Sequence, residues 1–455
     1  MKGKIAYLWS NLASNKTQYF LLLSFFFLPV QLNYYFWPTY SLLSGLRSDL
    51  LSPTLYLTDF FFVPLTFYAI IYFFKNERIV RFSVICFCLY LLMRSFLTPS
   101  PTLAFYYSLR IFQIGFLSYL LYTSIKNKLF NQIFRVSLLI SAVCVTSLAI
   151  AQFLLDHSVG GLFYYVGERT FSSQTPGIAH VIINGDKILR PYASFPHPNV
   201  LAGFLVAAIA FVLSQVTFTE VKKKLKYSLP LLFISCGVFL TFSRAATISL
   251  LFIYVLWILK SKKYTSVLIG GILAFFILIL TPAGNHLFST VLTEDAVVKR
   301  IFLLNAGITL FTKNILIGVG PGHFLPSLST LFPTLTLSFL QPVHSLFLLF
   351  LVELGIIGVL FGSYILRKIM QIRSFHFSLQ SISFLGVIAI LGGLDHYLWT
   401  LQQGRLILVI LLAGLFLSMR KRDVLGNRSL RNYPKRTHER KNEGRRNQKI
   451  TRKGL

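Results

Sequence analysis

The sequence has few acidic side chains and few cysteines, and it lacks the polar composition of a water-soluble protein. Asp and Glu number 14 against 44 Lys and Arg among 455 residues, which gives a net charge of +30. Hydrophobic residues make up 55%, and the mean hydropathy is +0.67. The cysteines lie inside apolar runs, which excludes a recognisable disulfide framework or metal-ligand spacing; they are Cys86, Cys88, Cys144 and Cys236. This composition predicts an integral membrane protein.

Ten-residue alternation of apolar and polar residues is also missing, which argues against lipid-embedded strands. Helices are the default for long apolar runs, and a span takes about 20 residues. We therefore predict an all-α polytopic protein with about 12 transmembrane helices. The first run has no obvious small-residue cleavage site after it, so we interpret it as an uncleaved span. The runs cover about 18–37, 55–74, 79–97, 103–124, 134–155, 199–217, 226–241, 246–260, 264–281, 343–365, 380–396 and 405–419.

Lys and Arg recur in every second connection, and short basic loops stay cytoplasmic. Both termini are therefore predicted to be cytoplasmic. Residues 1–17 form the N-terminus, 18–155 the N-terminal spans, and 156–419 a second membrane domain with long outer loops at 156–198 and 282–342. The tail 420–455 holds 14 basic and 3 acidic residues. This composition predicts a disordered segment that attracts anionic membrane lipids rather than nucleic acid.

Ionisable residues beside membrane spans are costly and are therefore site candidates. In this topology they collect at the outer ends of the spans, whereas Glu353 alone lies near the midplane. Mutual pairing is the simplest expectation for Asp59, Arg94 and Arg110. The remaining candidates are Arg190, His197, Asn199, Ser243, Arg244, Arg300, His344, Asp395, His396, Gln402 and Arg405.

Arginine and histidine at the outer mouth of an apolar bundle suit a lipid-linked anion, most simply a polyprenyl-diphosphate sugar. Guanidinium groups bind phosphate oxygens bidentately. Arg244 lies in a turn between two apolar runs, and because the turn itself does not require a cation, an anionic ligand would explain the arginine. Arg300 lies on a mixed segment, 297–311, that we expect to form a helix along the outer interface. His344 is a candidate base, because histidine exchanges protons near neutral pH. A structural role for each residue remains the alternative.

Four stretches, in order, resemble the superfamily of O-antigen ligases and O-antigen polymerases, which are membrane glycosyltransferases. They are Arg190 to Ala202, Leu240 to Ala246, Arg300 to Phe324 with Ile317-Gly-Val-Gly-Pro-Gly322, and His344 to Leu348 followed by Glu353-Leu-Gly-Ile-Ile-Gly358. The resemblance is strongest over residues 190–360.

The resemblance implies a GT-C-like enzyme, without metal or other cofactor, on the outer side of the cytoplasmic (inner) membrane. It would move a glycan from undecaprenyl diphosphate to a glycan, glycolipid or protein acceptor. Arg244 and Arg300 would hold the diphosphate, Arg190 would add a cationic contact, and His344 would activate the acceptor hydroxyl. His197, Asn199, Asp395, Gln402 and Arg405 are further substrate-binding candidates.

Two other classes of function remain open from the residues alone. A secondary anion transporter would place essential ionisable groups near the midplane on broken helices. A non-catalytic scaffold for polysaccharide assembly would tolerate Arg244→Ala and His344→Ala without losing glycan product. The four motifs fit ligases, polymerases and protein glycosyltransferases alike.

Overall fold

The protein was analysed as a computed structural model, which describes residues 16–43, 45–183, 185–215, 221–260, 294–335, 339–372 and 377–420. The expected span at 264–281, the first 15 residues and all of the basic tail beyond Arg420 lie outside this part of the chain.

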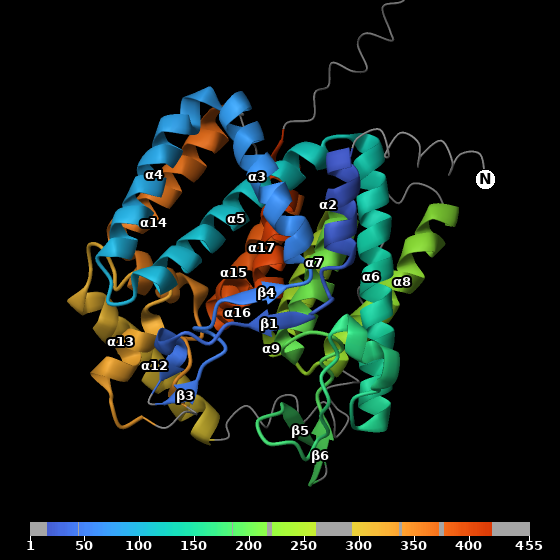
Figure 1. The fold of residues 1–455 in the computed structure, drawn as a ribbon. Helices are drawn as coiled ribbons and strands as arrows, with labels where there is room; N and C mark the ends of the chain where they lie inside the picture. Colours follow the sequence, from blue (N-terminus) through green and yellow to red (C-terminus); the bar gives the residue numbers. More distant parts are fainter. Residues whose placement is uncertain are drawn as a thin grey trace, which may run out of the picture. The chain divides into compact units, whose positions relative to one another are not determined.

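Helices dominate the described part of the chain (Figure 1). Helix starts follow local sequence: Pro101 occupies the first turn of α5, where its missing N–H is no loss, and the Asn127 side chain caps α6. The helices are α2 (Lys16–Phe26), α3 (Asp59–Asn76), α4 (Arg78–Phe96), α5 (Pro101–Ile125), α6 (Lys128–Leu155), α7 (Pro198–Gln215), α8 (Val221–Leu240), α9 (Arg244–Lys260), α12 (Glu294–Lys313), α13 (Phe324–Leu331), α14 (Leu346–Ile372), α15 (Leu379–Leu394), α16 (Tyr397–Thr400) and α17 (Gln402–Met419).

The core is built around α7 and α17, which are buried on nearly all sides. A helix that is apolar all round belongs in the interior of a bundle. Helix α7 packs against α6, α8, α9 and α17, while α17 also contacts α5 and α15. Helix α14 lies beside α4, and α2 lies beside α3 and α6 (Figure 1).

Among the described residues, five helices are long and apolar enough to cross a membrane: α4, α6, α7, α14 and α17. Helices α8, α9 and α15 contain shorter apolar segments. The prediction of an all-α polytopic membrane protein is confirmed. The count of about twelve spans and the GT-C-like arrangement stay predictions.

The first expected span, 18–37, is wrong in its second half. Helix α2 ends at Phe26, and residues 33–35 form strand β1 instead. Pro29 lacks a backbone donor and disfavours helical geometry at Leu28, so the helix does not continue through this point.

In the ranges that the structure describes, three short antiparallel strand pairs lie outside the helices. Strand β1 (Asn33–Tyr35) pairs with β4 (Thr54–Tyr56), and β2 (Leu42–Leu43) pairs with β3 (Leu46–Arg47). In the segment 156–198, β5 (His180–Ile183) pairs with β6 (Asp186–Leu189). Residues 282–342 contain α12 and α13, and α12 covers the helix expected at 297–311. Its position relative to a membrane stays a prediction.

The glycine-rich motif 317–322 packs against a break in α14. Gly355 has non-helical angles (φ 64°, ψ 178°) inside this helix. At the break, the Val319 N–H donates to the Val352 carbonyl at 2.8 Å, and the Gly320 N–H donates to the Glu353 carbonyl at 3.0 Å. Arg94 of α4 donates to the Ile317 and Gly318 carbonyls at 2.9 and 2.8 Å. Two of the four stretches that resemble the O-antigen ligase superfamily, the glycine-rich motif and the stretch around Glu353, therefore contact each other through backbone hydrogen bonds.

Replacing Gly318 with alanine tests this packing. Gly318 has φ +66°, and a Cβ there would lie 2.5 Å from the Glu353 carbonyl oxygen. Left-handed geometry and a backbone clash together are expected to lower the free energy of unfolding by about 2 kcal/mol or more. Thermal unfolding in detergent measures the change. Gly362→Ala, in open space on α14, is the control, and equal melting temperatures for the two variants would contradict the packing argument.

Candidate functional site

A polar cavity of about 470 Å³ lies where the N-terminal strands, α5, the segments that lead into α7 and α14, and the α15–α17 connection meet. Six of the candidate residues line it: His197, Asn199, His344, Asp395, His396 and Arg405. These residues are separated by up to 208 positions in the sequence, and the fold brings them together.

Asn199 connects two of these segments. Its side-chain oxygen accepts from Arg190 Nη2 at 2.8 Å, and its amide donates to Asp395 Oδ2 at 2.8 Å. Arg190 also donates from Nε to the Thr241 carbonyl at 2.8 Å, two positions before Ser243. Asn199 therefore positions the other two side chains, in addition to facing the cavity.

The Asp395 carboxylate lies among histidines. Its Oδ1 accepts from the His396 backbone N–H at 2.7 Å. Burial favours the neutral carboxyl, but His396 and His344 outweigh it and lower the pKa of Asp395. Burial and the charge of Arg190 lower the pKa of His197 to about 3. At neutral pH, the carboxylate is therefore ionised and His197 is neutral.

His344 occupies the boundary between the cavity and a group of cations. Its ring lies edge-on to that of His396, with centroids 5.3 Å apart. Its buried Nδ1 has no hydrogen-bond partner in the described part of the chain. Burial, then the charge of His396, lowers the pKa of His344 to about 4, and Arg300 and Lys299 act in the same direction. The imidazole is thus neutral at pH 7 and able to accept a proton.

Arg190, Arg244 and Arg300 form the cationic group beside this cavity. Burial, and next the positive charges of Arg244 and Arg300, lower the pKa of Arg190 to about 10, against the opposing effects of Tyr192 and Asp395. Arg244 is the first residue of α9, and Arg300 lies on α12; both side chains are exposed. None of the three is among the residues that line the cavity. The site therefore has a cationic part and a cavity part, with His344 close to both.

Gln402 and Arg405 belong to a polar network on the helical side of the cavity. Gln402 donates to Asp59 Oδ1 at 2.9 Å and accepts from Arg405 Nη2 at 3.1 Å. Asp59 forms an ion pair with Arg110 at 3.2 Å. Of the two predicted site residues in this network, Gln402 and Arg405, only Arg405 lines the cavity. The expected pairing of Asp59 with Arg110 is confirmed, whereas Arg94 binds carbonyl groups instead.

Glu353, the ionisable residue predicted near the midplane, is held in place by the protein. It is 3% exposed, and its Oε2 accepts from Trp399 Nε1 at 3.1 Å. A buried carboxyl satisfied in this way has a structural explanation. In the described part of the chain, no three His, Cys, Asp or Glu side chains lie together as a metal site would require.

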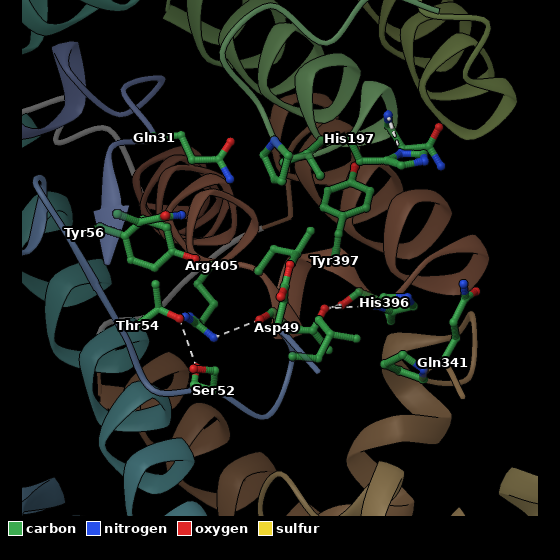
Figure 2. Close-up of a pocket in the computed structure, with 18 of the residues that line it drawn as sticks. Gln31, Asp49, Ser52, Thr54, Tyr56, His197, Gln341, His396, Tyr397 and Arg405 are labelled. Carbon is green, nitrogen blue, oxygen red and sulfur yellow. Dashed lines mark hydrogen bonds between the residues drawn. The ribbon is translucent and has the colours of Figure 1, made fainter. Parts of the chain in front are cut away.

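Sequence reasoning missed the N-terminal wall of the cavity. Asn33, Tyr35 and Tyr56 line it from β1 and β4, and Asp49 lies between these strands. Arg169, from the segment 156–198, lines it as well. Figure 2 shows Thr54 and Tyr56 across the cavity from Gln341 and His396. The polar residues within an aromatic run at 33–37 were the available signal, but the run was assigned to a span.

Comparison with known proteins adds one match. The family model described as "O-Antigen ligase" matches residues 229–361, a segment that contains Arg244, Arg300 and His344. No curated protein matches the chain. The family match confirms the resemblance that the motifs predicted: this chain is similar to the O-antigen ligase superfamily, which suggests a membrane enzyme that transfers glycans.

Proposed function

We propose that this protein transfers a glycan from a polyprenyl-diphosphate carrier to an acceptor hydroxyl at the outer face of the cytoplasmic membrane. The observation that carries the proposal is the position of His344: a neutral, half-buried imidazole that lines the cavity and feels the charges of Arg300 and Lys299. The family match over residues 229–361 supports transfer of a glycan. Whether the acceptor makes the enzyme a ligase, a polymerase or a protein glycosyltransferase is decided by experiment.

The chemistry follows from this arrangement. His344 removes the proton from the acceptor hydroxyl, and the oxygen attacks the anomeric carbon of the donor sugar. The bond from that carbon to the diphosphate oxygen breaks, and its electron pair stays on the diphosphate. Arg244 and Arg300, assisted by Arg190, stabilise the developing negative charge. The proton remains on His344 until solvent removes it. We propose that the reaction needs no metal, because the guanidinium groups supply the positive charge.

The proposed orientation places both termini in the cytoplasm, with about twelve spans in a GT-C-like arrangement. Helix α12 would then lie along the outer interface. In support, it exposes Ile301, Leu304 and Ile308 on one face while burying Leu303 and Leu310 on the other. A helix that is apolar on both faces suits a position between protein and lipid. Arg300 on this helix would meet a diphosphate at the headgroup level.

A transfer assay tests the proposal. Purified protein in nanodiscs is mixed with a polyprenyl-diphosphate-linked oligosaccharide and candidate acceptors, in the presence of EDTA, and products are separated by mass. A longer glycan or a glycosylated acceptor is expected. Loss of transfer with EDTA, restored by a divalent metal, would reject metal independence. If no transfer occurs and proteoliposomes containing the protein take up a radiolabelled anion, the protein is a secondary anion transporter and the proposal is rejected.

The pH profile of transfer gives a second test. A general base must be unprotonated, so activity falls as the pH drops through the pKa of the base. Because burial lowers the pKa of His344 to about 4, we expect a constant rate from about pH 6 upward and half the rate near pH 4. Single-turnover rates at saturating donor measure this, with return to pH 7 as the control for unfolding. A midpoint near the ordinary histidine value of about 6.5 would contradict the assignment.

A further inference from the structure

The pairing of β1 with β4 directs alternate side chains to opposite sides. Asn33 pairs with Tyr56, and Tyr35 pairs with Thr54, and all four line the cavity. Tyr34 and Leu55, the pair between them, face away and are 66% and 46% exposed. This alternation is the ordinary consequence of strand geometry. We call Asn33, Tyr35, Thr54 and Tyr56 the ladder face.

The ladder face is held in a defined position. The Tyr35 ring stacks on that of Trp37, with centroids 5.4 Å apart and 22° between the planes. The Thr54 hydroxyl donates to the Ser52 carbonyl at 2.9 Å, and the Tyr56 N–H donates to Asp59 Oδ2 at 3.0 Å. The Tyr56 side chain is 7% exposed. Preorganised aromatic side chains bind with little loss of conformational entropy.

The composition of this wall suits a sugar more than a phosphate. Tyrosine rings present a negative face to the C–H groups of a sugar ring, while hydroxyl, amide and carboxylate groups bind its hydroxyls. Asp49 lies on the same wall, and its negative charge would repel a diphosphate. The three arginines of the cationic group lie outside the cavity lining. The two arginines that do line it, Arg169 and Arg405, donate to backbone carbonyl groups of the protein. The cavity volume of about 470 Å³ is within the range of small-ligand sites.

We propose that the ladder face binds the sugar of the acceptor glycan and holds one of its hydroxyls toward His344. This inference rests on the proposed function and adds to it the location and the chemical class of the acceptor. The donor diphosphate then stays with the arginines, and the acceptor enters from the opposite side of His344. The two substrates approach the base from different parts of the site, as a direct transfer between them requires.

Substitutions on the two sides of β1 test the inference. Tyr35→Ala and Asn33→Ala are each expected to raise the KM for the acceptor about tenfold, because each removes contacts made to the bound sugar. The KM for the donor should not change. Tyr34→Ala, on the exposed side of the same strand, is the matched control and should behave as wild type. Melting temperatures in detergent check folding, and Tyr35→Phe, which keeps the ring, replaces Tyr35→Ala if that variant unfolds.

Direct binding separates this inference from the proposed function. Short oligosaccharides cut from the surface glycans of the producing cell are added to the protein without donor, and saturation-transfer NMR detects binding. Binding lost in Tyr35→Ala and Asn33→Ala but kept in Tyr34→Ala supports the ladder face, even if wild type transfers nothing and the transferase is thereby rejected. Transfer and binding that are unaffected in both ladder-face variants would overturn the inference and leave the transferase standing. A wild-type protein that neither binds nor transfers would overturn both.

Discussion

His344→Ala is expected to lower the transfer rate by about 100- to 10,000-fold, the usual contribution of a general base. The neutral imidazole lines the cavity, and its buried Nδ1 makes no hydrogen bond within the described residues. A histidine with only a structural role would normally have its buried nitrogens satisfied. Removing it should therefore affect the chemical step. The single-turnover rate with donor and acceptor both saturating measures that step.

The control for this variant is His180→Ala. His180 is an exposed histidine on β5, and it does not line the cavity, so its loss should leave the rate unchanged. Donor binding by His344→Ala should also persist, because the arginines that would hold the diphosphate remain. A loss of rate of only about threefold or less would be far smaller than the contribution of a general base. The role of base would then belong to another group, and His396, whose ring lies 5.3 Å away, would be the next candidate.

The apolar runs predicted the helices well, because a run of about 20 apolar residues has few alternatives in a membrane. The charge map also grouped some residues that meet in the structure. Asn199 and Asp395, 196 positions apart, were both placed at outer ends and are hydrogen-bonded in the structure. Residues at adjacent ends of neighbouring helices can thus be grouped from sequence. Their partners cannot, because pairing depends on which helices pack together.

The N-terminal wall escaped prediction for a different reason. Strands β1 and β4 are each three residues long, too short for a period of two to stand out from an apolar run. The aromatic residues at 34–37 extend the apolar run without indicating which face is buried. Arg94 likewise had a plausible acidic partner in the sequence, yet it binds the carbonyls of Ile317 and Gly318. Carbonyl acceptors are present at every position, so composition does not reveal such a contact.

Arg300→Ala is expected to lower kcat by about 100- to 1,000-fold, the usual loss when one group that stabilises transition-state charge is removed. Charge develops on the diphosphate as its bond to the sugar breaks, so the effect should be larger on kcat than on the donor KM. Arg300 lies on α12 with an exposed side chain, and its charge reaches both Arg190 and His344. Initial rates over a range of donor concentrations give the two constants.

Arg300→Lys distinguishes the effect of the planar, bidentate guanidinium group from the effect of its positive charge. Lysine keeps the positive charge but cannot bind two phosphate oxygens in one plane, so an intermediate rate is expected. Lys313→Ala removes an exposed cation from the other end of the same helix and should leave the rate unchanged. If Lys313→Ala and Arg300→Ala lose activity equally, the cations of α12 act through lipid attraction alone. If only Arg300 matters and lysine restores part of the rate, the guanidinium group contacts the leaving diphosphate, and α12 carries part of the catalytic site.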